Sequence, residues 1–130
     1  MSEINDATVI EGLRRQLAIA AARQAVASSN LANVNTPGYR TREVAFSAAL
    51  DEHMDGALTP GASLVGRLGA PAGGPTVVEA EGLTPRRDGN NVRLDRELLT
   101  MAQAAGEFAR AQTALAAKFR LVRYAINEGR

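Results

Sequence analysis

The sequence predicts a mainly α-helical protein, in which long N- and C-terminal helices pair as an antiparallel coiled-coil hairpin around a Gly/Pro-rich, irregular middle segment. Apolar residues recur at alternating spacings of three and four near both ends of the 130-residue chain, and glycine and proline concentrate between them. Aromatic residues make up only 4% of the chain, while alanine is abundant. Such a chain has few large side chains to fill a globular core, so a narrow seam between helices fits it better.

The first predicted unit is an N-terminal coiled-coil helix over residues 1–35. Its apolar stripe begins near Thr8, and Asp6 is a candidate N-cap residue. Pro37 lacks the backbone donor that a helix interior needs, so the helix must end before it. The stripe consists of Ile10, Leu13, Leu17, Ala20, Gln24, Ala27, Leu31 and Val34, with Gln24 as its one polar interruption.

A turn and a short helix are predicted over residues 36–54. Thr36–Tyr39 suits a type II turn, because Pro37 occupies position i+1 and Gly38 can adopt the positive φ that position i+2 requires. Apolar residues within Phe46–Met54 favour a short amphipathic helix after the turn. Short polar side chains just before the turn can satisfy the carbonyls that a helix end leaves open, and these are Asn30, Asn33 and Asn35.

A flexible Gly/Pro-rich linker is predicted over residues 55–91. Eight of the 12 glycines and four of the five prolines fall there, which is incompatible with a continuous helix. Within it, only Thr76–Glu79 has the composition of a brief strand. Asp88–Asn91 ends the linker with turn-forming residues, and Asn91 is a candidate N-cap for the helix that follows.

The last predicted unit is a C-terminal coiled-coil helix over residues 92–130. Asp95 and Glu97 lie in its first turn, where the helix dipole favours negative charge. Two such stripes at the two ends of one chain imply that the terminal helices pair with each other. The stripe consists of Leu94, Leu98, Met101, Ala105, Phe108, Gln112, Leu115, Phe119, Val122 and Ile126. The residues predicted to pack in the seam are Leu13, Leu17, Leu31, Leu98, Met101, Phe108, Leu115, Phe119, Val122 and Ile126.

The composition argues against most chemical functions. A net charge of +1 gives no reason to expect nucleic acid as a partner, and no apolar run is long enough to predict a membrane span. There is no cysteine, and the single histidine, His53, has only loosely spaced carboxylates around it, so no metal site is predicted. The glycines lack the context of a phosphate-binding loop. We therefore expect no enzyme activity, no catalytic residues and no cofactor.

Two stretches of the sequence resemble a known family. Ser28–Arg42 resembles the signature near the N-terminus of bacterial flagellar rod and hook proteins. Asp88–Glu97, followed by Lys118–Arg123 and Ala125–Ile126, is similar to the C-terminal region of the short proximal-rod proteins. The resemblance covers about the first 50 and the last 40 residues. The residues that match the family signature are Ser29, Asn30, Leu31, Ala32, Asn33, Asn35, Thr36, Pro37, Gly38 and Tyr39.

This resemblance implies a structural subunit of the proximal rod, exported unfolded by the flagellar type III system and polymerised in the basal body on the periplasmic side of the inner membrane. The implied partners are other copies of the chain, other proximal-rod proteins, the MS-ring protein, the export-gate adaptor at the rod base and the type III export gate.

Phe46 and Leu50 fit the short Phe-x-x-x-hydrophobic element with which such proteins dock on the export gate, although the same spacing also suits a helix packing pair. Two alternatives stay open. The chain could be another short axial subunit, or a cytoplasmic coiled-coil adaptor or export chaperone.

Overall fold

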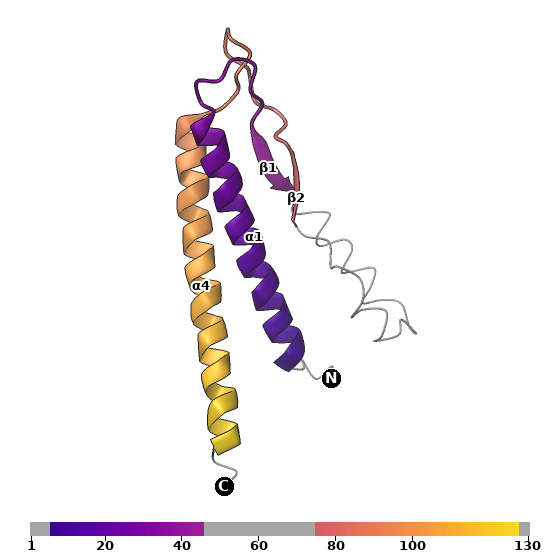
Figure 1. Cartoon of the computed structure of the whole chain (residues 1–130), viewed down its shortest axis with the longest axis vertical. Coiled ribbons are helices and arrows are strands. Elements are labelled where there is room, and N and C mark those ends of the chain that lie inside the picture. The colour runs from indigo at the N-terminus through magenta and orange to yellow at the C-terminus, as the bar shows by residue number, and fades with distance from the viewer. Residues whose placement is uncertain (1–5, 46–74, 128–130) are drawn as a thin grey trace, which may run out of the picture.

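A computed structural model describes residues 6–45 and 75–127 of the chain. Helix α1 (Asp6–Ala32) is followed by strand β1 (Arg42–Ala45), strand β2 (Thr76–Glu79) and helix α4 (Leu94–Asn127). Figure 1 shows the two helices side by side, with the β pair beside α1. We call the end where α1 finishes and α4 starts the closed end, and the opposite end, where α1 starts and α4 finishes, the open end.

The two helices run in opposite directions. Three side-chain pairs join them, and residue numbers fall along α4 as they rise along α1. Lys118 pairs with Asp6 at 2.6 Å near the open end, Arg23 with Glu107 at 2.9 Å midway, and Asn30 donates to Glu97 at 2.9 Å at the closed end. The predicted pairing of the terminal helices is therefore confirmed.

Helix α1 uses much of its predicted stripe for this pairing. Ala20 and Ala27 are buried, and the predicted seam residues Leu13, Leu17 and Leu31 are partly buried. Because the fully buried apolar positions are alanines, the backbones of the two helices can approach closely. Gln24, the polar member of the stripe, is exposed.

Helix α4 faces its partner with a different row of residues from the predicted one. Its buried residues are Glu97, Ala104 and Ala111, which are spaced by seven. Leu98 is 50% exposed, Phe119 51% and Ile126 69%. Phe108, another predicted seam residue, is also exposed. The intramolecular seam position predicted for Leu98, Phe119 and Ile126 is therefore wrong for the single chain, whereas Phe108, 37% exposed, lies on the same row of α4 as Met101 and Leu115.

The predicted and the observed seams on α4 differ by a shift of one residue in one of their two rows. Met101, Leu115 and Val122 belong to the predicted stripe and are partly buried, so this row is shared between prediction and structure. The row beside it was expected to be Leu98, Ala105, Gln112, Phe119 and Ile126. In the structure the row that begins one residue earlier, at Glu97, takes its place. The heptad spacing holds on α4, but small and polar residues fill the seam.

A two-stranded antiparallel sheet lies beside α1. Arg42 pairs with Glu79 and Ala45 with Thr76. The strand predicted at Thr76–Glu79 is confirmed as β2, whereas β1 was not predicted. Residues 75–91, which the sequence analysis placed in the linker, thus carry β2 and the loop that leads to α4. The short helix expected within Phe46–Met54 lies outside the described residues.

The two helix boundaries at the closed end differ in how well the sequence predicted them. The type II turn is confirmed, because Tyr39 N donates to Thr36 O at 3.2 Å and Gly38 has a φ of 73°. Asn91 does not cap α4, since its side-chain oxygen accepts from Thr41 N at 2.6 Å instead. In the part of the chain that the structure describes, neither helix is long and apolar enough to cross a membrane.

Candidate functional site

Five buried polar residues gather at the closed end of the helix pair, and we call them the polar clasp. They come from the end of α1, the start of β1, the loop before α4 and the first turn of α4. Polar groups are buried in proteins only when hydrogen bonds replace their contacts with water, so this cluster needs a full account of its partners. The polar clasp consists of Asn30, Thr41, Asn90, Asn91 and Glu97.

Asn30 is the centre of the polar clasp and is 1% exposed. Its Nδ2 donates to Arg42 O at 2.7 Å and to Glu97 Oε2 at 2.9 Å. Its Oδ1 accepts from Arg42 N at 3.0 Å and from Tyr39 Oη at 3.1 Å. Two donor hydrogens and two acceptor lone pairs are all that an asparagine amide offers, so this side chain is saturated.

The bonds to Arg42 have a specific geometric meaning. A neighbouring strand would bond both the N–H and the C=O of one residue, and the Asn30 amide does the same from the end of α1. Asn30 thus joins three elements, because it holds β1 through Arg42 and α4 through Glu97. The Glu97 carboxylate lies in the first turn of α4, where the helix dipole favours negative charge.

Asn90, in the loop before α4, hydrogen-bonds to the turn that follows α1. Its Nδ2 donates to Asn33 O and to Thr36 O, both at 2.9 Å, and its Oδ1 accepts from Val92 N at 2.8 Å. Both carbonyls also accept a backbone N–H of the turn, from Thr36 and Tyr39 respectively, so the Asn90 amide occupies their second lone pairs and ties the loop before α4 to the turn after α1. The Arg86 guanidinium donates to Val34 O in the same region.

Two glycines let the two loops of the closed end touch. Gly38 N donates to Asp88 O at 2.8 Å, and Gly89 has a φ of 83°. A Cβ added at Gly89 would lie 3.3 Å from Gly38 Cα, so a side chain there would meet both a strained backbone and a crowded neighbour. Asn91 completes the junction, since its N–H donates to Tyr39 O at 3.3 Å. Within the described residues, Thr41 Oγ1 is buried without a hydrogen-bond partner.

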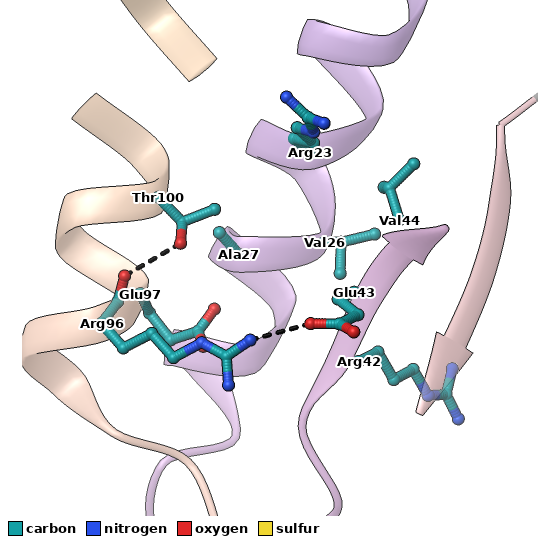
Figure 2. A pocket seen from close by; sticks show the side chains of 9 residues that line it. All are labelled: Arg23, Val26, Ala27, Arg42, Glu43, Val44, Arg96, Glu97 and Thr100. Atoms are coloured by element: carbon teal, nitrogen blue, oxygen red, sulfur yellow. Dashed lines mark hydrogen bonds and ion pairs between the residues drawn. The ribbon is translucent and has the colours of Figure 1, made fainter. Parts of the chain in front are cut away.

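A pocket of about 220 Å³ is lined by residues of α1, β1 and the first turns of α4, and Figure 2 shows their side chains. Arg96 extends across to Glu43, with 2.8 Å between Nη2 and Oε2. The Arg23 and Glu97 side chains, which also line the pocket, have the partners described above. Its charges are therefore used to brace β1 and the two helices against one another. Among the described residues there is no group of three or more His, Cys, Asp or Glu that could hold a metal ion.

The structure brings together part of the family signature and leaves part of it outside. Asn30, Asn33, Thr36, Gly38 and Tyr39 take part in the hydrogen bonds of the closed end, and Ser29 supplies a carbonyl that accepts from Asn33 Nδ2 at 2.8 Å. Leu31 is partly buried, whereas Ala32, Asn35 and Pro37 are exposed. The export-gate docking candidates Phe46 and Leu50 lie outside the described residues.

The roles of Asn90, Asn91 and Glu97 were not predicted from the sequence. Asn90 and Asn91 were expected to be turn and cap residues, and Glu97 to be a charge favoured by the helix dipole. One signal was available, since asparagines are concentrated both in Asn30–Asn35 and in Asn90–Asn91. Two polar clusters at the facing ends of paired helices have to bond to each other if they are buried.

The sequence of the chain matches known proteins over the segment that forms this site. Residues 13–40 match the family described as "Flagella basal body rod protein", a stretch that holds the second half of α1 and the turn. The flagellar basal body rod protein FlgB of Yersinia enterocolitica is 34% identical over an alignment of 98 residues, and the match covers 66% of this chain and 69% of that protein. FlgB of Yersinia ruckeri is 33% identical over 95 residues, with the same shares covered.

The matched stretch contains Asn30 and every turn residue that Asn90 and the two glycines hold in place. The identity and the share of both chains that it covers establish more than a local motif. The chain belongs to the FlgB family of flagellar basal-body rod proteins.

Proposed function

We propose that the chain is a structural subunit of the proximal rod of the bacterial flagellum, and that it polymerises by burying a second face of α4 against helices of neighbouring subunits. The proposal builds on the membership of the chain in the FlgB family of flagellar basal-body rod proteins. The observation that carries the proposal is the exposed row of large apolar side chains along α4. Its members are Leu94, Leu98, Phe108, Phe119 and Ile126, which are 37–69% exposed in the single chain.

Helix α4 carries two heptad rows on either side of a shared middle row. The inner row contains Glu97, Ala104 and Ala111 and faces α1. The outer row is the exposed row named above: Leu98, Phe119 and Ile126 repeat every seven residues, and Leu94 and Phe108 lie beside them at the edge of the middle row. Between the inner and outer rows lie the partly buried Met101, Leu115 and Val122. A helix with two adjacent apolar rows can pack against two different helices, so the outer row supports coiled-coil packing with another subunit.

The inner seam alone gives limited stability to the helix pair. Its buried apolar side chains are alanines, which remove little apolar surface from water when they pack. Isolated helices are marginal in water, and most helical stability in proteins comes from packing an apolar face. Covering the outer row in an assembly would add the missing apolar contacts. A chain that is fully stable only when assembled also suits export in an unfolded state.

The finer features of the proposal follow from the resemblance. The subunit would be exported by the flagellar type III system, with Phe46 and Leu50 docking on the export gate. On the periplasmic side of the inner membrane it would link the MS-ring protein and the export-gate adaptor to the other proximal-rod proteins. Isolated basal bodies that lack this chain would instead favour a cytoplasmic adaptor or export chaperone.

Charge introduced into the outer row tests the proposal. Leu98→Asp, Phe108→Asp or Phe119→Asp should stop rod assembly and swimming while leaving secretion of the chain intact, because a buried, unpaired carboxylate strongly disfavours association. The matched control is Gln103→Asp, which adds the same charge at an exposed site of α4 outside the row. Swimming by all three outer-row variants would show that this row is not a packing surface.

A further inference from the structure

The β pair has one closed edge and one open edge. Ala80 N donates to Thr41 O at 2.9 Å, which makes these two residues a hydrogen-bonded pair. Such pairs recur at every second position of an antiparallel ladder, so Glu43 with Val78 is the next one. The peptide groups of Arg42 and Val44 on β1, and of Val77 and Glu79 on β2, therefore point away from the partner strand.

Helix α1 bonds to the outer edge of β1 at Arg42. The N–H and C=O of Arg42, which point outward, both bond to the Asn30 amide. The outer edge of β2 has no such cover among the described residues, because no hydrogen bond reaches the outward N–H or C=O of Val77 or Glu79. All four residues of β2 are exposed. Within the described residues, a side chain thus bonds to the outer edge of β1 at Arg42, whereas the outward N–H and C=O groups of Val77 and Glu79 on β2 have no hydrogen-bond partner.

The side chains along the open edge indicate what it could bind. Val77 is 46% exposed and Val78 39%, and they project to opposite faces of the strand. A hollow of about 390 Å³, lined by Tyr39, Arg42 and both valines among others, adjoins them. Glu79 and Glu81, both exposed, follow the valines, and the Glu79 carboxylate lies 3.9 Å from the Arg40 guanidinium in an exposed ion pair that a competing cation can replace. β2 is a short edge strand of four residues that follows Pro75 and itself contains no proline or lysine.

We propose that the outer edge of β2 is a docking site for an extended segment of a neighbouring rod subunit, which pairs with it as a third strand. The segment has β-branched apolar residues beside Val77 and Val78 and a basic residue beside Glu79 and Glu81. Main-chain hydrogen bonds supply affinity in this mode of recognition, and the valines and the two carboxylates supply specificity. The occupant rests on the proposed function, because the assembled rod provides the neighbour.

The first test uses the free chain and a synthetic peptide, acetyl-Lys-Val-Thr-Val-Lys-amide. Added at millimolar concentration to the ¹⁵N-labelled full-length chain, it should shift the amide signals of Val77 and Glu79 and slow their hydrogen exchange. A peptide with glutamate in place of both lysines should bind more weakly. Unshifted signals would overturn the proposal. So would slow exchange at Val77 and Glu79 before any peptide is added, because another part of the chain would then occupy the edge.

The second test uses proline at an outward-facing position. Val77→Pro removes an N–H that points away from β1, so it should block docking while β1 and β2 stay paired. Val77→Thr keeps that N–H and is the matched control. Unchanged amide signals of Ala80 and Asn91 would show that the closed end is intact. Peptide binding should be lost in Val77→Pro and kept in Val77→Thr; equal binding by the two variants would overturn the proposal.

In cells, recovery of Val77→Pro in isolated basal bodies should fall about tenfold or more relative to Val77→Thr, which corresponds to about 1.4 kcal/mol of lost association free energy. Equal recovery of the two variants would contradict a role for this edge in the rod. Absence of the wild-type chain from basal bodies would refute the proposed function instead. The peptide experiment would still decide whether the edge binds an extended segment.

Discussion

The two ends of the helix pair are built on opposite principles. At the closed end most of the buried side chains are polar, with Ala80 and Val92 as apolar exceptions, and Asn30 and Asn90 satisfy backbone groups from several elements. Toward the open end the seam is filled by alanine, one exposed ion pair links Asp6 to Lys118, and the large apolar side chains of α4 face outward. Directional hydrogen bonds thus fix how the two helices are joined, and the non-directional apolar surface is left for other contacts.

The largest expected effect comes from removing the centre of the polar clasp. Asn30→Ala should destabilise the folded chain by roughly 3–5 kcal/mol, because it leaves the Arg42 peptide group and the Glu97 carboxylate buried without their partner. Urea denaturation followed by circular dichroism measures the loss. Asn35→Ala is the control, since Asn35 is exposed, and its effect should stay within about 0.5 kcal/mol. Equal losses in both variants would mean that the closed end does not hold the helices together.

A pair of neighbouring alanines tests which row of α4 faces α1. Ala104 is 1% exposed, so Ala104→Leu should overpack the seam and destabilise the chain by about 1–3 kcal/mol. Ala105 belongs to the predicted stripe but is exposed, and Ala105→Leu should leave stability almost unchanged. The same denaturation measurement serves for both. The opposite order of effects would restore the seam that the heptad pattern alone predicted.

The smallest effect is expected at the open end. The Lys118 Nζ lies 2.6 Å from Asp6 Oδ1, but the Asp6 side chain is 62% exposed, so solvent weakens this ion pair. Lys118→Ala should cost less than about 1 kcal/mol, and the cost should shrink further in high salt. Thermal unfolding at low and high ionic strength measures both. A loss as large as that of Asn30→Ala would remove the distinction between the two ends.

The sequence was sufficient to predict the helix pair but not the row of contacts on α4. Period-seven apolar patterns at both ends predict pairing, and the proline and glycine after α1 predict the turn. The heptad pattern is clearest for the largest apolar side chains, and it therefore predicted that the row beginning at Leu98 would face α1. The row that is buried begins with a charged residue, Glu97, whose burial is possible only because Asn30 lies opposite it. That compensation depends on a residue from the other helix.

Strand β1 and the roles of the asparagines were beyond local reasoning for the same reason. Arg42–Ala45 has little strand propensity of its own, and it is held by β2 on one side and by Asn30 on the other. Asn90 looks like a turn residue until the end of α1 is placed beside it. The resemblance to rod proteins identified the signature correctly, but the signature alone did not show that its first asparagine would bond to β1 and α4.

The hydrogen bond between Asn30 and Glu97 joins residues 67 positions apart in the chain, and this separation limits when the two helices can pair. A polypeptide that emerges N-terminus first, from a ribosome or from a narrow channel, brings out Asn30 long before Glu97. Until Glu97 has emerged, the Asn30 amide hydrogen-bonds to water, and α1 has no second helix to pack against. The helix pair therefore forms only after the last third of the chain has emerged. A chain that has emerged only in part stays unfolded and can still move through a narrow channel.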